Sequence, residues 1–363
     1  DSTSYNMPIL IRMHQYYDPI DLRKCIMSII LKFEILRMKF KIEENELWQI
    51  VFPYDELSIQ IIRKDNLDPL EEMKSFVRPF SLENDALIRA EILLTNNEEF
   101  LLIDIHHIIS DEVSNHNILS MLDAELSGKK IVFDEWGNFG EYSEYVQNRS
   151  FEKEEKAWKG ILKDIKMERL TLPRSNSLSF PKMEGAKQGI LLPIDTLKKI
   201  REISIDTNCS IYAVLLSFLF ILLKKVCNQD MITVGCPISE RNIGKYENTL
   251  GPFVNTAIIF NKVDDNKIIG TLIAEIQESI LFAIENINYP FEKIVNLCDV
   301  GSAKGQNPIF DVLFNFYEDS KYGTFDLFDI EVNVPKVDLS FNVSENDTRL
   351  FLECEYNKAH YSS

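Results

Sequence analysis

The chain has 363 residues, more than the ~250–300 at which a single hydrophobic core stops growing, so its length predicts two lobes. Hydrophobic residues make up 45% and charged residues 26%, the proportions of an ordinary globular protein. With 39 Lys and Arg against 57 Asp and Glu, the net charge is −18, which repels a phosphate backbone, so we expect no nucleic-acid partner.

Strand and helix patterns alternate along the chain, which favours an α/β fold with mixed sheets (α+β). Asp18-Pro19 is typical of a helix start, and apolar residues follow it at helical spacing: Leu22, Cys25, Ile26, Ile29 and Ile30. The next patterns predict strands at 48–52, 87–94 and 100–105, and helices at 69–76 and 113–126.

The middle of the chain separates the two predicted lobes. A charged helical pattern covers 150–165, and a stretch rich in Pro and Ser at 172–185 is typical of a linker or crossover. Beyond it the patterns predict a strand at 189–192, helices at 194–204, 210–226 and 270–283, and strands at 231–236, 256–260, 309–316, 328–334, 337–343 and 350–356. We therefore expect an amino-terminal lobe at 1–149 and a carboxy-terminal lobe at 150–363.

Two features bear on the cellular location. The longest apolar run, 211–223, is shorter than the ~20 residues that span a membrane, and no signal-peptide pattern opens the sequence. The six cysteines form no CxxC pair, so we expect reduced, buried thiols. These features predict a cytoplasmic protein with no membrane partner.

The segment 101–114, LLIDIHHIISDEVS, holds two of the five histidines. Its pattern predicts a buried strand, a short loop and a helix. Because successive strand side chains point to opposite faces, His106 and His107 are not expected to face the same site. A histidine at the end of a strand suits proton transfer, since its unperturbed pKa is about 6.5, and Asp111 is expected to hold the loop. The segment alone leaves a catalytic and a structural role open.

Other kinds of site find less support in the sequence. A metal site lacks a third close ligand, because His14, His116 and His360 are scattered along the chain. A hydrolase triad would need a nucleophile in a G-x-S-x-G turn, and the sequence contains neither that turn nor a P-loop or G-x-G-x-x-G. We therefore expect no metal.

The histidine segment also resembles a known motif. HHIISDE at 106–112 is similar to the HHxxxDG motif of condensation domains of nonribosomal peptide synthetases and of related CoA- or carrier-dependent acyltransferases. Other segments resemble family motifs in the same order: KFEILRMKF at 32–40, FGEYSEYV at 139–146, SERNIGKYENTLGPFVNT at 239–256, YPFEKIV at 289–295 and NPIFDVLFNF at 307–316. Together they cover nearly the whole chain.

The resemblance implies a fold and a set of partners. Two lobes, each similar to chloramphenicol acetyltransferase, would form a V with the active site in a central tunnel, and a crossover loop would lie near 239–256. Donor and acceptor peptidyl carrier proteins would deliver an acyl or peptidyl thioester and an aminoacyl thioester. Each arm is a phosphopantetheine of the carrier, so the domain would need no cofactor of its own. Neighbouring synthetase domains are further implied partners.

The resemblance also implies roles for single residues. The acceptor amine would attack the donor thioester and form an amide. His107 corresponds to the second histidine of the motif, after His106, and would position the amine, remove its proton or stabilise the tetrahedral intermediate. Asp111 corresponds to the structural Asp, and Arg241 to the Arg that pairs with it.

Two further residues belong to the crossover loop in this comparison. Gly251 would supply backbone freedom there. Asn255 would lie in the part of the loop that passes from one lobe under the other, and would shape the floor of the tunnel.

The match departs from the family at Glu112, which occupies the glycine position of the motif. A glycine there leaves room for the substrate arm, whereas a carboxylate adds bulk and charge. Either Glu112 turns outward and stabilises the helix amino terminus, or it alters the activity or the substrate. The sequence also begins after the family's usual first motif, so we expect a portion of a longer chain or a reduced domain.

Three functions therefore stay open. An amide-forming condensation domain is the leading one. A free-standing acyltransferase that makes esters shares the same HHxxxD core. The third is a condensation-like domain that is catalytically altered or inactive and recruits a protein partner, which Glu112 keeps open. The presence of His107 and Asp111 argues against this third function, because a domain that only binds a partner need not retain them. Epimerization and heterocyclization domains are disfavoured, because the sequence shows no second Glu-Gly-His-type segment and keeps the histidine doublet.

Overall fold

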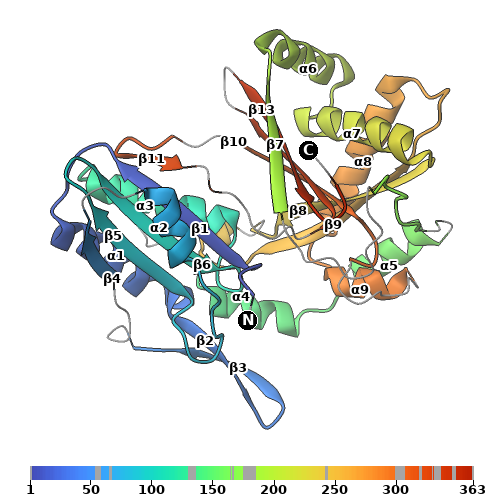
Figure 1. Ribbon diagram of the computed structural model, residues 1–363. Helices are drawn as coiled ribbons and strands as arrows, with labels where there is room; N and C mark the ends of the chain where they lie inside the picture. Colours follow the sequence, from blue (N-terminus) through green and yellow to red (C-terminus); the bar gives the residue numbers. More distant parts are fainter. Residues whose placement is uncertain are drawn as a thin grey trace. The chain divides into compact units, whose positions relative to one another are not determined.

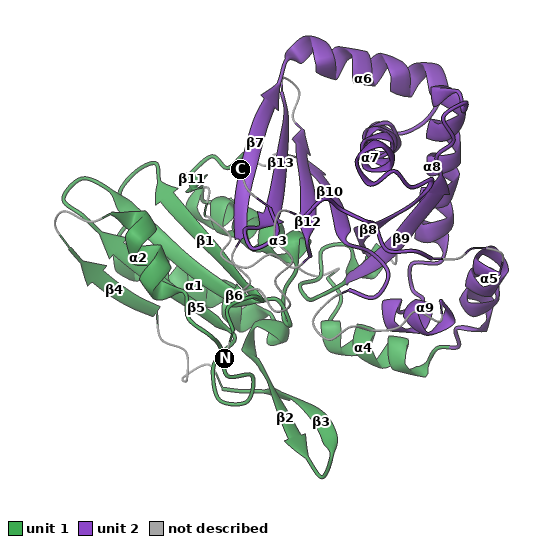
Figure 2. Ribbon diagram, turned by 45° about the vertical axis from the view of Figure 1, so that its right-hand side comes forward, with its two compact units in different colours: residues 1–149, 241–253, 320–330 green, residues 150–240, 254–319, 331–363 purple. Residues whose placement is uncertain are grey.

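The computed structural model describes residues 2–53, 59–64, 68–129, 136–163, 165, 167–174, 185–241, 244–298, 307–318, 321–328, 330, 337–345 and 349–361. The chain forms two compact units, coloured separately in Figure 2. Unit 1 comprises residues 1–149, 241–253 and 320–330, and unit 2 comprises residues 150–240, 254–319 and 331–363. Two short segments from the second half of the chain therefore belong to unit 1. The predicted division into a lobe 1–149 and a lobe 150–363, their V and the tunnel stay predictions.

Unit 1 is built on a five-stranded sheet with the order β11-β1-β6-β5-β4 (Figure 1). Neighbouring strands are antiparallel except β4 and β5, which are parallel. The elements of the unit are β1 (Asn6–Met13), α1 (Pro19–Lys32), the 3-10 helix η1 (Glu34–Arg37), β2 (Met38–Glu43), β3 (Glu46–Val51), β4 (Ile59–Arg63), α2 (Pro69–Phe76), β5 (Ile88–Leu94), β6 (Glu99–His106), α3 (Glu112–Leu126), α4 (Phe139–Asn148), the 3-10 helix η3 (Gly244–Tyr246) and β11 (Phe325–Phe328).

Helices cover both faces of this sheet. Ile103 and Ile105 of β6 lie in the core that α1 and α3 share with the sheet, whereas Leu102 points to the other face, where it packs with Met73 and Phe76 of α2. The period of two along a strand separates these sets. Because β6 is buried on both faces, it has a nearly continuous apolar sequence up to the histidine doublet.

Strands β2 and β3 form a separate two-stranded hairpin in unit 1 (Figure 1). Their register pairs Lys41 with Trp48. The turn residues Glu44 and Asn45 both have positive φ angles, 51° and 66°, the conformation that closes a tight two-residue hairpin. The predicted strand at 48–52 is therefore the second arm of a hairpin whose first arm the sequence pattern did not reveal.

Unit 2 is built on a six-stranded sheet with the order β7-β13-β12-β10-β8-β9, in which β10 runs parallel to β8 and β12 and the other pairs are antiparallel. The elements are α5 (Glu152–Leu162), β7 (Gly185–Leu192), α6 (Ile194–Thr207), α7 (Ile211–Cys227), β8 (Met231–Ser239), β9 (Val254–Lys262), α8 (Ile269–Glu285), α9 (Phe291–Leu297), β10 (Val312–Glu318), β12 (Leu339–Glu345) and β13 (Leu350–Asn357). Helices α6, α7 and α8 share one core with the sheet, and α5 and α9 share another.

The predicted mixed α/β fold is confirmed, and the elements differ from the sequence patterns in a few places. Helix α2 has the predicted bounds, and α1 begins at Pro19 with Asp18 as its cap. Of the predicted strand 328–334, only two residues are described: Phe328 is the last residue of β11, which pairs with β1, and Ile330 is not in a strand, whereas residues 329 and 331–334 lie outside the described residues. Most of the predicted linker, 175–184, also lies outside them.

The structure also describes the cysteines and the length of the helices. All six cysteines are free thiols; Cys227 and Cys236 are buried, and the other four are partly buried. Within the part of the chain that the structure describes, no single helix is both long and apolar enough to cross a membrane. Helices α6 and α7 reach that length and composition only as a pair, across a bend of 105°.

Candidate active site

The histidine doublet lies where β6 ends. His106 is the last residue of the strand, and residues 107–109 form the turn that leads toward α3. The predicted alternation of side chains along the strand therefore holds as far as His106. The turn, and not the strand, sets the direction of the His107 side chain. The backbone N–H of His107 still continues the sheet, since it donates to the carbonyl of Tyr5 at 2.8 Å.

The ring of His107 is held by its own loop. Its Nδ1 lies 2.8 Å from the backbone carbonyl oxygen of Ser110. A carbonyl only accepts, so Nδ1 carries the hydrogen and donates it. In the neutral ring this leaves Nε2 with its lone pair, which can accept a proton or a hydrogen bond from a substrate. The side chain of His107 is partly buried, so the turn both orients the ring and limits its contact with water.

His106 has a different environment. Its Nδ1 accepts a hydrogen bond from the backbone N–H of Ile108 at 3.0 Å. Its ring stacks on Tyr5 at 6.1 Å and meets the edge of Phe80 at 5.8 Å. Burial lowers the pKa of His106, and the nearby His107 lowers it further. His106 is therefore a packed, neutral ring that closes the turn before His107.

The carboxylate of Asp111 is fully buried and accepts hydrogen bonds from Ser114, Arg241 and Phe253. It caps α3 by accepting from the backbone N–H of Ser114 at 2.8 Å. Both of its oxygens bind the guanidinium of Arg241, at 2.7 and 2.8 Å, and one accepts from the backbone N–H of Phe253 at 3.0 Å. The structure thus brings Asp111 and Arg241 together within unit 1.

Ser114 completes this network and was missed by the sequence reasoning. Its hydroxyl contacts Asp111, accepts from Arg241 at 2.7 Å, and lies 2.9 Å from both the backbone N and O of Gly251. The signal was its place three residues after the capping Asp, where a helix amino terminus commonly carries a polar partner. Asp111, Ser114 and Arg241 together bind segment 241–253 to the start of α3.

Aromatic rings surround the same segment. The guanidinium of Arg241 lies 4.4 Å from the centre of the Phe253 ring, which packs with Tyr142 and Tyr246. Gly251 has a φ of 149°, and a Cβ added there would be 2.3 Å from the ring of Phe139. The predicted need for glycine at 251 therefore has two causes, the backbone conformation and the close approach of Phe139.

Glu112 and Asn255 are the two remaining residues that the sequence singled out. Glu112 is the first residue of α3 and is exposed, a position where a carboxylate interacts favourably with the helix dipole. Asn255 belongs to unit 2, and the expectation that it lies in the crossover loop is wrong. It lies in β9, opposite Ile238, and its amide donates to the carbonyls of Ile287 and Tyr289 at 2.6 and 3.0 Å.

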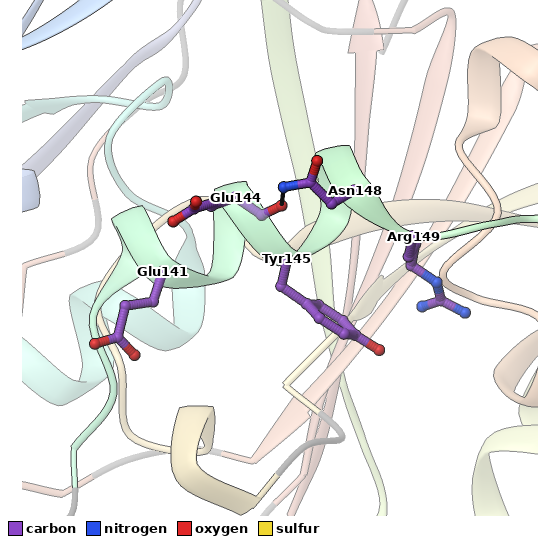
Figure 3. Close-up of a pocket in the computed structure, with 5 residues that line it drawn as sticks. All are labelled: Glu141, Glu144, Tyr145, Asn148 and Arg149. Atoms are coloured by element: carbon purple, nitrogen blue, oxygen red, sulfur yellow. Dashed lines mark hydrogen bonds between the residues drawn. The ribbon is translucent and has the colours of Figure 1, made fainter.

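A pocket on unit 1 lies on a single helix, as Figure 3 shows. Glu141, Glu144, Tyr145, Asn148 and Arg149 line it, all from α4 or its carboxy-terminal end. Asn148 donates to the carbonyl of Glu144 at 2.9 Å, and Arg149 lies 5.8 Å from the centre of the Tyr145 ring. None of the histidine-loop residues lines this pocket, so it is not the candidate active site.

Comparison with known proteins shows the family to which the chain belongs. The family model of the condensation domain matches residues 1–363, the whole chain. The chain is a member of the condensation domain family. Condensation domains as a family are acyltransferases, and in nonribosomal peptide synthetases they work with neighbouring carrier-protein domains.

The relatives of this condensation domain are segments of much longer synthetases. Bacitracin synthase 3 of Bacillus licheniformis is 28% identical over 97% of the chain, and tyrocidine synthase 2 of Brevibacillus parabrevis is 27% identical over 97%. The chain spans 6% and 10% of the length of these two relatives.

Solved structures share the fold of the condensation domain at low identity. The condensation domain of the monacolin K polyketide synthase MokA superposes with a TM-score of 0.85 at 16% identity, covering 100% of this chain and 89% of that one. The X-domain from teicoplanin biosynthesis has a TM-score of 0.85 at 16% identity, covering 99% and 86%. The epimerization domain of the third module of tyrocidine synthetase B has a TM-score of 0.79 at 16% identity, covering 99% and 88%.

Proposed function

We propose that this condensation domain forms an amide bond between two carrier-bound substrates, with His107 as the group that handles the proton of the acceptor amine. The observation that carries the proposal is the hydrogen bond from Nδ1 of His107 to the carbonyl of Ser110. It selects the tautomer in which Nε2 is an acceptor, which a residue that binds or deprotonates an amine requires.

The proposed reaction balances without any further reagent. The amine nitrogen of the acceptor aminoacyl thioester attacks the carbonyl carbon of the donor thioester, and the C–N bond forms. Nε2 of His107 accepts the proton that the amine loses. The C–S bond then breaks, and the leaving sulfur of the donor phosphopantetheine takes the proton. The two phosphopantetheine arms are substrates that arrive on carrier proteins, and the donor and acceptor carriers are the proposed partners.

The buried ion pair supports this role indirectly. Asp111, which binds Arg241, directly follows Ser110, whose carbonyl orients the imidazole of His107. A fully buried carboxylate held by Ser114, Arg241 and Phe253 leaves the start of α3 little freedom. The loop that carries the orienting carbonyl is thereby fixed at its carboxy-terminal end.

A second candidate function rests on Glu112. The family motif has glycine at this position, and the exposed carboxylate at the start of α3 adds bulk and charge near the histidine loop. A domain altered in this way could bind a carrier or another protein without turnover. The X-domain of similar fold has been solved in a complex with OxyB, which shows that a relative of this shape can present a protein-binding surface.

Reconstituted turnover tests the proposal. A donor carrier loaded with an acyl or aminoacyl group and an acceptor carrier loaded with an amino acid are mixed with the domain, and the condensed thioester is detected by mass spectrometry. We expect product with wild type and a large loss with His107→Ala. The matched control is His116→Ala, which removes a histidine of the same unit that contacts Tyr322 instead; it should retain the product.

Two further arms separate the alternatives. An acceptor that presents a hydroxyl in place of the amine tests the ester-forming acyltransferase, which would condense it efficiently. Binding of both carriers by a wild type that makes no product with either acceptor would contradict the catalytic proposal and favour recruitment. Equal product from wild type and His107→Ala would contradict the role of His107 while leaving condensation in place.

A further inference from the structure

Beneath the histidine doublet, on the face of the sheet covered by α2, lies a polar pair that the reaction does not use. The amide Nδ2 of Asn6 donates to Oδ2 of Asp104 at 2.7 Å and to the backbone carbonyl of Arg78 at 3.0 Å. Asp104 lies in β6 two residues before His106, and it is fully buried. The pair therefore joins the beginning of β1 to the end of β6.

The position of Asn6 connects this pair to His107. Asn6 is the first residue of β1 and lies opposite His106 in the sheet register. The preceding residue, Tyr5, accepts the hydrogen bond from the backbone N–H of His107 at 2.8 Å, and its ring stacks on His106. Movement of the amino-terminal end of β1 would consequently move the support of both histidines.

Arg89 also lies close to the carboxylate of Asp104. It lies opposite Asp104 in the register of β5 and β6, and its guanidinium is 3.8 Å from Oδ2 of Asp104. It donates to the carbonyl of Arg78 at 3.0 Å and lies 3.6 Å from the centre of the Phe80 ring, whose edge meets His106. Three strands and segment 78–80 thus meet around one carboxylate.

We propose that Asn6 and Asp104 are positioning residues for His107, which hold the end of β1 against β6 so that the turn after His106 keeps a single geometry. Neither residue touches the reacting groups. They act through Tyr5, whose carbonyl binds the backbone of His107. As far as it concerns the rate of amide formation, the inference rests on the proposed function.

The contacts of Asp104 also indicate which substitution at position 104 should preserve the hydrogen bond with Asn6. Among the described residues, Oδ1 of Asp104 and Oδ1 of Asn6 are buried and have no hydrogen-bond donor. An asparagine at position 104 keeps the acceptor that Asn6 needs and brings an additional donor into this acceptor-rich place. Alanine at position 104 removes the acceptor and leaves the Asn6 amide and Arg89 without it.

The activity test therefore compares Asp104→Ala, Asn6→Ala and Asp104→Asn with wild type, using the loaded carriers. We expect both alanine variants to lose about 10- to 100-fold in kcat, with the KM for the carriers unchanged, because misplacement of a catalytic group by ~1 Å has such an effect. Asp104→Asn should stay within about threefold of wild type, as expected when a hydrogen bond, not a charge, positions the turn. Asp123→Ala is the matched control: its carboxylate also joins distant segments, binding Thr324 at 2.8 and 2.6 Å, but away from the doublet.

A spectroscopic measurement tests the inference without turnover. In the domain labelled with 15N-histidine, long-range 1H–15N correlation reports which ring nitrogen of His107 carries the hydrogen, with His107→Ala as the assignment reference. Wild type and Asp104→Asn should show the Nδ1–H tautomer. Asp104→Ala and Asn6→Ala should show a mixture or exchange broadening at His107, while the resonances of His116 stay in place.

The outcomes separate the inference from the proposed function. A wild type that makes no product removes the proposed function, and the His107 tautomer then decides the inference alone. The inference is overturned if the alanine variants keep kcat and the His107 resonances of wild type, or if Asp104→Asn falls as far as Asp104→Ala. If Asp104→Ala fails to fold, Asn6→Ala, which leaves the carboxylate beside Arg89, provides the same comparison.

Discussion

The carboxylate of Asp111 and the guanidinium of Arg241 form a two-pronged ion pair across 130 residues of sequence, with N–O distances of 2.7 and 2.8 Å. Asp111 is 0% exposed and Arg241 is 9% exposed. Because both charged groups are buried, the stability of each depends on the other. The pair, and the contacts of Ser114 with Gly251, attach segment 241–253 to the helix that follows the histidine loop.

Removing one member of this pair should be costly. We expect Asp111→Ala or Arg241→Ala to lower the free energy of unfolding by about 3–5 kcal/mol, since the remaining charge stays buried and loses this ion pair. The double variant should lose less than the sum of the two, which urea unfolding and a double-mutant cycle would measure. As a control, Arg12→Ala breaks an exposed pair with Asp326 and should cost about 0–1 kcal/mol. Additive losses would contradict the coupling.

Gly251→Ala should destabilise unit 1 for two separable reasons. The added Cβ meets the ring of Phe139, and the φ of 149° disfavours a side chain. Overpacking and backbone strain each cost about 1–3 kcal/mol. Adding Phe139→Leu should recover only the steric part of the loss and leave the part due to the backbone angle. Gly160→Ala in α5, where no atom lies within 4 Å of the new Cβ, should instead stabilise by about 0.5–1 kcal/mol. Full recovery in the double variant would show that the backbone angle costs nothing.

Glu112→Gly tests whether the departure from the family motif matters for catalysis. Because Glu112 is exposed at the start of α3, we expect kcat to stay within about threefold of wild type. Loss of the carboxylate at the helix amino terminus, together with the flexibility of glycine, should lower stability by about 1 kcal/mol. Glu112→Gln separates charge from bulk. A rise in turnover of tenfold or more with glycine would show that the carboxylate obstructs the substrate arm.

The stability of unit 1 should depend on pH through Asp104. Burial raises the pKa of Asp104 to about 6, although Asn6, Arg89 and Arg78 lower it in part. A carboxyl whose folded pKa lies above the unfolded value of 3.8 stabilises the fold at low pH, and this contribution is lost as the pH rises through about 6. The stability of wild type relative to Asp104→Asn should therefore fall by on the order of 3 kcal/mol between about pH 4 and pH 7.

Urea unfolding of both proteins across this range measures the difference. Asp326→Asn is a control of opposite sign: the hydrogen bond with His14, and then that with Arg12, lowers the pKa of Asp326. Its contribution is present above the unfolded pKa and is lost as the pH falls. A constant difference between wild type and Asp104→Asn from pH 4 to pH 7 would contradict the assignment to Asp104.

Much of the secondary structure follows from local patterns in the sequence. Asp18-Pro19 starts α1, and the apolar run of β6 ends at the histidine doublet, because capping and burial on both faces leave clear signals. The first strand, Asn6–Met13, and residues 325–327 of β11 were missed. Each pairs with a strand far away in sequence, and β11 covers only four residues at a sheet edge. A short edge strand such as β11 acquires its conformation from its partner, so local propensity carries little information about it.

The candidate site was likewise predictable only in part. Motif resemblance singled out His107, Asp111 and Arg241, but the contacts of Ser114, Phe139 and Asn6 depend on packing between segments up to 137 residues apart. The predicted location of Asn255 was wrong for a different reason. The motif continues across Gly251 into Asn255, whereas the chain passes at Val254 from unit 1 into a strand of unit 2. A continuous motif gives no sign of such a boundary.

The membership of segments 241–253 and 320–330 in unit 1 has a consequence for biosynthesis. A ribosome releases the chain from its amino terminus, so residues 1–149 emerge long before the Arg241 side chain and strand β11 exist. Until then Asp111 has no cation and the outer edge of β1 is unpaired. Unit 1 should consequently reach its final state only after residue 330 has been translated. A recombinant exchange of residues 1–149 between condensation domains would separate this unit from two of its own parts, and a cut beyond residue 330 would keep them together.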